Sequence, residues 1–186
     1  VRVERSGNQR WLVVAATPDK LWDTVKDFWQ ETGFIVNIER PDAGVMETDW
    51  AEDRAKIGGD VTRNTVGKLL DSLYSTGERD KYRTRFEPGV EPGTTDIFIS
   101  HRGMEEVYTS SAKDDTRWQP RPPDPELEAE MLRRLMVRMG SDEKRAEASV
   151  ASAKAEPRAN LAKSDDGAGT LEVYERFDRA WRRVGL

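Results

Sequence analysis

Apolar residues recur at helical spacing in two segments of the first 140 residues, one near each end. The earlier segment, 17–33, carries one broad apolar face: Leu21, Trp22, Val25, Phe28 and Trp29. Thr17 is expected to be the N-cap of this helix, Pro18 its first residue and Gly33 its stop.

The later helical segment is 124–140, with Asp124 as the expected N-cap and Gly140 as the stop. Its apolar stripe consists of Leu127, Met131, Leu132, Leu135, Met136 and Met139. A third and weaker helix is expected at 60–74.

Between the two strong helices the pattern changes to the two-residue alternation of strands. Tyr82, Thr84 and Phe86 alternate with charged residues, which predicts a strand with one dry face. Strands are expected at 10–16, 34–39, 45–50, 80–87, 94–101 and 104–110. The segment 117–123 is expected to be an extended connector, because its prolines exclude a helix.

This order of elements predicts an α+β domain. The helix at 124–140 would lie across one face of a curved antiparallel sheet, with the helix at 18–32 beside it. This is the helix-grip arrangement.

The composition of the chain changes after residue 140. Residues 141–169 contain no aromatic residue and are rich in Ala, Lys, Glu, Asp and Ser, which predicts a flexible linker with transient helix around 142–156. Residues 170–186 repeat the strand-then-helix pattern of the start when Trp181 is aligned with Trp22. The expected organisation is therefore a first helix-grip domain at 1–140, a linker at 141–169 and the truncated start of a second helix-grip domain at 170–186.

Charge and composition exclude several classes of protein. A net charge of −5 and a pI near 5.2 argue against nucleic-acid binding. The chain has no cysteine, so it holds no disulfide and no thiolate site. It also lacks a run of the roughly 20 apolar residues that a membrane helix needs. Without an initiator Met or a signal peptide, it is interpreted as an internal fragment.

Residues with catalytic or metal-binding chemistry are sparse. His101 is the single histidine, and no GxSxG or nucleotide motif accompanies it, which favours a structural role. The acidic group Glu47, Asp49, Glu52 and Asp53 lacks the spacing of a calcium loop and has no histidine nearby. We therefore expect no catalytic residue, no metal site and no cofactor.

Six tryptophans offer candidates for either core or recognition. Trp22 and Trp29 are expected in the core, because they share one helix face. Core is also favoured over a recognition role for Trp11 and Trp50, which lie at strand ends. Trp118, in the proline-rich segment, is expected to be the most exposed.

The chain closely resembles the BamC family, also called NlpB or lipoprotein-34, in three long blocks. These are GVMETDWAEDRAKI (44–57), LLDSLYSTGERDKYRTRFE (69–87) and IFISHRGMEEVY (97–108). The likeness extends over residues 8–140. It implies tandem helix-grip domains joined by a flexible linker, in an accessory subunit of the BAM machinery that folds β-barrel proteins into the bacterial outer membrane.

The resemblance also implies where the protein is located and what it binds. A lipid anchor would hold it at the outer membrane, facing either the periplasm or the cell exterior. Its partners would be other BAM subunits, above all the lipoprotein BamD, which the family grips through an N-terminal segment outside this chain. No catalytic residue is known for the family.

Residue types favoured in interfaces gather in the loop-rich stretch 50–80, where we expect the partner-binding surface. The candidates are Trp50, Arg54, Lys56, Tyr74, Arg79 and Asp80. The alternative is a carrier of a lipid or another apolar ligand, and an enzyme is the weakest reading. A roomy cavity between helix and sheet would favour the carrier, whereas a filled core would favour the interaction module. The residues expected to line such a cavity are Trp22, Phe28, Phe86 and Leu135.

Overall fold

The computed structural model describes residues 1–51, 77–109 and 115–153, together with the backbone of 159–163 and 169–173. The main sheet contains β1 (Arg2–Ser6), β2 (Gln9–Val14), β3 (Val36–Arg40), β4 (Val45–Thr48), β5 (Glu78–Pro88), β6 (Thr95–Tyr108) and β7 (Thr116–Arg121). The helices are α1 (Pro18–Glu31), α3 (Pro125–Arg138) and α4 (Glu143–Ser152), with a short 3₁₀ helix, η1 (Pro41–Ala43), between β3 and β4. A separate hairpin pairs β8 (Ala159–Lys163) with β9 (Gly169–Val173).

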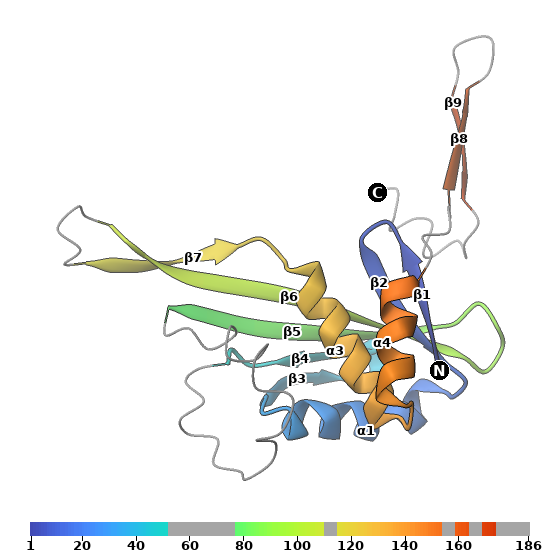
Figure 1. Ribbon diagram of the computed structural model, residues 1–186, viewed down its shortest axis with the longest axis horizontal. Coiled ribbons are helices and arrows are strands. Elements are labelled where there is room, and N and C mark those ends of the chain that lie inside the picture. The colour runs from blue at the N-terminus through green and yellow to red at the C-terminus, as the bar shows by residue number, and fades with distance from the viewer. Residues whose placement is uncertain (52–76, 110–114, 154–158, 164–168, 174–186) are drawn as a thin grey trace.

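All neighbouring strands of the main sheet are antiparallel, in the order β1-β2-β6-β5-β4-β3. β7 pairs with the C-terminal half of β6, and the two form an arm that extends past the end of β5 (Figure 1). The predicted hairpin of β3 and β4 is confirmed. The strands expected at 94–101 and 104–110 are instead one continuous strand, β6.

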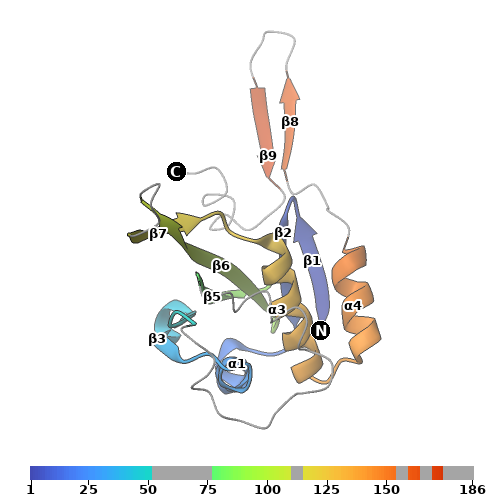
Figure 2. The same cartoon turned by 60° about the vertical axis from the view of Figure 1, so that its left-hand side comes forward.

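The helices cover one face of this sheet. α3 lies in the middle of the helical layer and packs on β2 and β6, with α1 on one side of it and α4 on the other (Figure 2). The prediction of an α+β domain with an antiparallel sheet is thus confirmed, and the arrangement is consistent with a helix grip.

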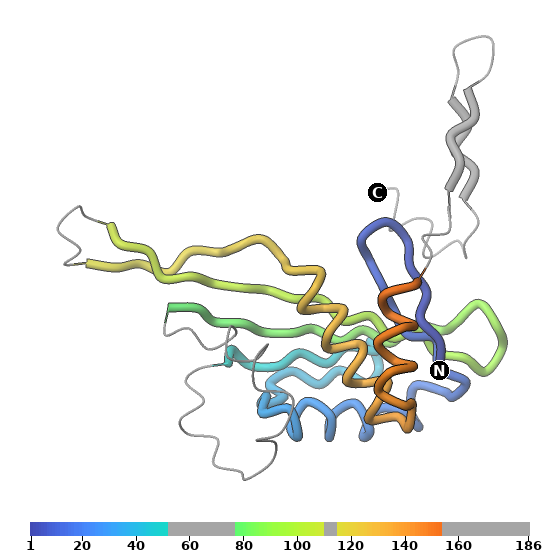
Figure 3. Tube along the Cα trace, in the orientation of Figure 1, coloured from blue at the N-terminus to red at the C-terminus, as the bar shows by residue number. Residues whose placement is uncertain are grey.

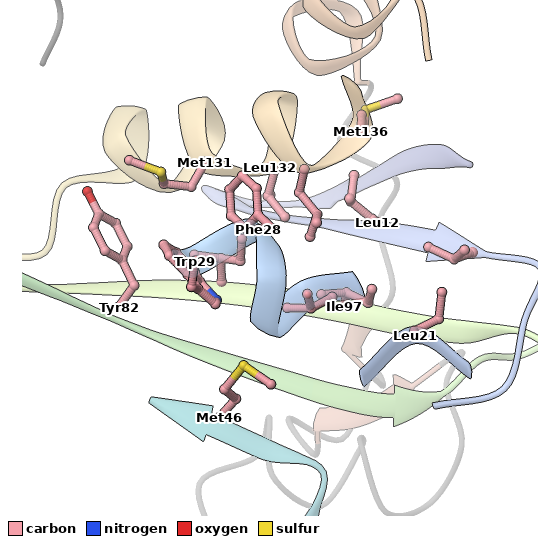
Figure 4. Packing of buried hydrophobic residues seen from close by; sticks show 14 of the residues in the cluster. Leu12, Leu21, Phe28, Trp29, Met46, Tyr82, Ile97, Met131, Leu132 and Met136 are labelled. Atoms are coloured by element: carbon pink, nitrogen blue, oxygen red, sulfur yellow. The ribbon is translucent and has the colours of Figure 1, made fainter. Parts of the chain in front are cut away.

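Side chains from the helices and the sheet fill the space between them. Trp29 of α1 is fully buried, stacks on Tyr82 at a centroid distance of 5.1 Å and donates its indole N–H to the Thr84 hydroxyl at 2.9 Å. Tyr82 rises from β5 toward Met131 of α3 (Figure 4). Phe34 meets both aromatic rings edge-on, at 5.3 and 5.5 Å. This end of the core is therefore an aromatic cluster held in place by one buried hydrogen bond.

Two packed elements, β1 and α4, were not predicted as part of the core of the domain. At the start, β1 pairs with β2 through a two-residue turn at Gly7 and Asn8, where Gly7 has a φ of 58°. At the end, α4 occupies part of the expected linker and buries Ala146 and Val150 in the main core. The packed residues therefore run from β1, which lies inside the predicted range 1–140, to α4, which lies beyond Gly140.

Local predictions at the ends of the elements have mixed outcomes. Asp124 accepts hydrogen bonds from the backbone N–H groups of Glu126 and Leu127, so it is a true N-cap. Thr17 holds the N-cap position of α1, but its side chain caps no N–H group. The 117–123 segment is not a simple connector, because it contains β7, an edge strand that tolerates Pro120. The helix expected at 60–74 lies outside the described residues.

We expect Trp29→Ala to lower the free energy of unfolding by about 3–5 kcal/mol, the usual loss for a buried large aromatic side chain. Trp22→Ala is the matched control. Trp22 was predicted to lie in the core, but it is only half-buried, packs on Phe86 at 5.1 Å and reaches Glu39. Urea unfolding should therefore show a smaller loss, roughly 1–3 kcal/mol. Equal losses would contradict this account of the core.

Candidate functional site

A buried polar cluster joins four elements at the end of the sheet where α3 begins. Asp80 of β5 and His101 of β6 are 2% and 1% exposed, and the Asp80 Oδ1 atom lies 2.7 Å from His101 Nε2. Arg121 of β7 donates to the same carboxylate oxygen. On the other side of the ring, His101 Nδ1 accepts the backbone N–H of Asp124 at 3.0 Å. The cluster therefore fastens the first turn of α3 to three strands.

The hydrogen bonds determine which nitrogen of His101 carries the proton. Because Nδ1 accepts an N–H group from Asp124, the ring proton is on Nε2 and points at Asp80. The backbone N–H of His101 donates to Glu128 Oε1 at 2.8 Å. Both ring nitrogens are thus engaged within the domain. This arrangement supports the predicted structural role of His101 and leaves no ring nitrogen to act as a base.

Gly103 lets Arg121 reach this cluster. The two residues face each other across β6 and β7, and a Cβ atom on Gly103 would collide with the Arg121 side chain. Because Gly103 has no side chain, the Arg121 guanidinium can pass over β6 and reach Asp80. No spacing rule in the sequence reveals this requirement, although the SHRG stretch contains both His101 and Gly103.

The opposite face of the sheet, which we call the open face, carries a row of cations. Along β5, Asp80, Tyr82, Thr84 and Phe86 are buried toward the helices. The residues that alternate with them, Arg79, Lys81, Arg83 and Arg85, consequently project from the open face.

Aromatic rings lie against three of these four cations. The Arg79 guanidinium is 4.1 Å from the centroid of Trp118, and Lys81 Nζ is 5.0 Å from that of Trp50. The Arg85 guanidinium is 4.8 Å from Phe98, which itself stacks on Trp11 at 5.4 Å. Such contacts hold long cationic side chains in place and contribute roughly 0.5–1 kcal/mol each at exposed sites. We call the four cations of β5 together with these rings the cation–aromatic row, and it is the candidate functional site. Its members are Arg79, Lys81, Arg83, Arg85, Trp11, Trp50, Phe98 and Trp118.

Carboxylates balance part of this row. Glu47 of β4 accepts from Lys81 at 2.5 Å and lies 4.0 Å from Arg83, while Arg85 pairs with Glu87 at 2.6 Å. Glu47 therefore serves in salt pairs with the cations of β5. Within the described part of the chain, no group of three metal-binding side chains is found.

The six predicted partner-binding residues fall in different environments. Trp50 and Arg79 belong to the cation–aromatic row. Asp80 points to the other face and is buried in the His101 cluster, so its carboxylate is not part of an exposed surface. Arg54, Lys56 and Tyr74 lie outside the described residues.

Sequence reasoning missed the remaining members of the row, among them Arg83, Arg85 and Trp118. The alternation in 80–87 identified the dry face of β5, and the same pattern could have identified the cationic one. Trp118 was expected to be exposed, but it is half-buried against Arg79. Its pairing partner on β6 could not be known, because β7 was not recognised as a strand.

The residues expected to line a ligand cavity are packed against other side chains. Phe28, Phe86 and Leu135 are 2%, 5% and 0% exposed, and Trp22 covers Phe86. Close ring contacts thus occupy the region in which a carrier would hold its ligand.

The fold and the row together define an α+β domain with a helix-covered face and an open, charged face. Comparison with known proteins identifies it further: residues 1–153 match the family of the outer membrane protein assembly factor BamC-like N-terminal domain. The chain belongs to this family.

Two curated relatives carry the name outer membrane protein assembly factor BamC. One, from Accumulibacter regalis, is 69% identical over the whole chain, which covers 49% of that relative; the other, from Thiobacillus denitrificans, is 62% identical and covered to 50%. An uncharacterised protein of Neisseria meningitidis serogroup B is 47% identical over the whole chain, which covers 47% of it. The chain thus spans about half the length of the curated relatives it matches. None of the helices in the described residues is long and apolar enough to cross a membrane.

We expect Asp80→Asn to destabilise the domain by about 3 kcal/mol, because it removes the charge that His101 and Arg121 share in a buried site. Glu78→Gln is the matched control. Its carboxylate lies 3.6 Å from the same guanidinium, but its side chain is 33% exposed, and the loss should stay below about 1 kcal/mol. Urea unfolding at neutral pH measures both. Equal effects would show that the buried pair has no special role.

The pH dependence of stability should reflect Glu128. Burial raises the pKa of Glu128 above its usual range, against the opposing effect of the His101 N–H bond. The folded domain therefore holds this proton more tightly than the unfolded chain does. Protonated Glu128 therefore stabilises the folded domain at pH values below the ordinary glutamate pKa of about 4.3. This contribution to the free energy of unfolding is lost as the pH rises through the raised pKa.

Glu128→Gln keeps an oxygen acceptor but cannot ionise, so between pH 4 and 7 the variant should lose less stability than the unmodified chain. The control is Glu126→Gln, two residues earlier in α3. The Glu126 side chain is 82% exposed, so this variant should leave the pH profile unchanged. Thermal melting across this range makes the comparison. Parallel profiles for the Glu128 variant and the unmodified chain would contradict the assignment.

Proposed function

We propose that this chain is the first domain of a non-catalytic accessory lipoprotein of the outer-membrane β-barrel assembly machinery, and that it acts as a protein-interaction module. The family match over residues 1–153 is the observation that carries this proposal. The names of the two BamC relatives support the assembly role. We further propose that 170–186 begins a second helix-grip domain and that BamD is among the partners of the whole protein.

The two faces of the sheet favour interaction over carriage of a ligand. The helix-covered face is filled by side chains such as Trp29 and Leu135, both 0% exposed. The open face instead presents cations beside aromatic rings, a combination of residue types enriched at interfaces. We therefore propose the cation–aromatic row as the docking surface for another component of the machinery.

A pull-down of the full-length lipoprotein from its own membranes tests this function. Deletion of residues 1–153 should remove at least one assembly component from the purified material. The variant Trp50→Ala with Trp118→Ala should reduce the same component several-fold, because hot-spot tryptophans carry much of an interface's affinity. Because both side chains are half-buried, this variant should lose some stability, so the pull-down is made at a temperature at which its melting curve shows that it is folded. Trp22→Ala, which removes a half-buried tryptophan outside the row, should retain the component under the same conditions.

The control is Ile35→Ala with Val137→Ala, which removes exposed apolar side chains outside the row. This variant should retain its partners. If the deletion leaves every partner in place, the interaction function is wrong. If only the tryptophan variant behaves like the unmodified protein, the function stands and the docking surface lies elsewhere.

A further inference from the structure

β5 and β6 run side by side along the sheet (Figure 3), and their register brings three cationic residues together on the open face. Lys81 of β5 lies directly opposite Arg102 of β6 in the antiparallel register, and Arg83 lies opposite Ser100, diagonal to Arg102. Neighbours of this kind are roughly 5–8 Å apart on one face of a sheet. We call Lys81, Arg83 and Arg102 the triad.

A single carboxylate serves the triad within the described residues. Glu47 is 2.5 Å from Lys81 and 4.0 Å from Arg83, and none of the ion pairs in this part of the chain involves Arg102. Arg102 is exposed, and the Arg83 side chain is 47% exposed. The triad therefore presents an excess of positive charge to solvent on a chain whose net charge is −5.

Folding does not account for this arrangement. Like charges directly opposite each other on a sheet are destabilising, and the Lys81–Arg102 pair is such a case. Arg138 is matched by Glu31 at 2.7 Å and Arg2 by Glu91 at 2.8 Å, whereas Arg102 has no carboxylate partner among the described residues. An anionic partner bound across Lys81 and Arg102 would relieve their repulsion.

We propose that the triad binds an extended acidic segment of a partner protein, with carboxylates on alternate residues. This inference rests on the proposed interaction function and names the chemistry of the partner. Same-side residues of an extended chain repeat every ~6.5–7 Å, which matches the spacing of Lys81 and Arg83 along β5. The guanidinium groups of Arg83 and Arg102 can each take a carboxylate through two parallel hydrogen bonds.

The surroundings of the triad favour a polypeptide over a lipid surface. Proteins that dock on membranes through cations usually add aromatic side chains that enter the interface. Of the rings on this face, Trp11 and Phe98 are buried, at 1% and 8% exposure, and Trp50, which lies against Lys81, is half-buried. None of these three rings is among the exposed large apolar side chains of the described residues.

The test uses the complete 186-residue chain and a fluorescent ten-residue peptide in which Glu alternates with Thr. A second peptide of the same composition carries its Glu residues in one block. Fluorescence anisotropy at low and at physiological salt measures binding. We expect the alternating peptide to bind more tightly than the block peptide, and its affinity to fall as salt rises.

Arg83→Glu with Arg102→Glu should weaken binding of the alternating peptide by about tenfold or more. The matched control is Lys20→Glu with Lys144→Glu, which changes the net charge equally on the exposed surfaces of α1 and α4. It should bind as the unmodified chain does. If the charge-reversed variant melts at a lower temperature, Arg83→Gln with Arg102→Gln replaces it and should show an intermediate loss.

Three results would overturn the inference. The first is equal binding of both peptides, which would mean a simple polyanion effect. The second is binding to vesicles containing anionic phospholipid that the alternating peptide cannot displace. The third is self-association of the chain that the triad variant abolishes, which would assign the surface to a second copy. The proposed function fails separately, because it depends on the partners lost when residues 1–153 are deleted.

Discussion

The contact between Asp80 and His101 is the constraint on which the rest of this domain depends. It joins β5 to β6 and, through His101 Nδ1, holds the first turn of α3. Since Asp80 must point toward the helices, the alternation of β5 turns Arg79 and Lys81 to the opposite face. A one-residue slip of β5 would bury the cations and expose the aromatic core. The same pair thus sets the position of the grip helix and the orientation of the candidate site.

The layer beneath the helices contains two chemically distinct clusters that adjoin each other. In one, the Asp80 carboxylate contacts His101 and Arg121, and His101 accepts the backbone N–H of Asp124. In the other, Trp29, Phe34 and Tyr82 pack ring against ring. Tyr82 joins the two clusters, 5.4 Å from His101 and 5.1 Å from Trp29. The polar cluster specifies the register of strands and helix, and the aromatic cluster fills the neighbouring part of the core. Together they leave little reason to expect a ligand between helix and sheet.

Much of the fold could be predicted from local patterns, whereas the site required knowledge of strand pairing. The periodicity of 17–33 and 124–140 identified α1 and α3, and the alternation at 80–87 identified β5. β1 escaped because its apolar residues are few and its burial depends on β2 and α4. The sequence predicted α4 only as a transient helix around 142–156, and its packing on the core escaped because two buried side chains, Ala146 and Val150, give a weak apolar signal. Asp80 was assigned to the partner surface because a carboxylate gives no apolar signal, although the alternation of β5 places it on the same face as Tyr82.

Because the sheet has a structural face and an open face, residues of the open face can be substituted without touching the core. Substitutions at Arg83 or Arg102 touch none of the groups that hold α3 on the sheet, because alternate residues of a strand belong to different faces. In the proposed arrangement, stability and recognition depend on separate residues of the same two strands, with Asp80, Tyr82, Ile99 and His101 on one side and the triad on the other. Electrostatic contacts at the exposed side act mainly on encounter and partner choice, whereas the buried side sets the free energy of unfolding. Charge substitutions at Arg83 or Arg102 should therefore leave the fold intact, because they leave Asp80, His101 and Gly103 in place.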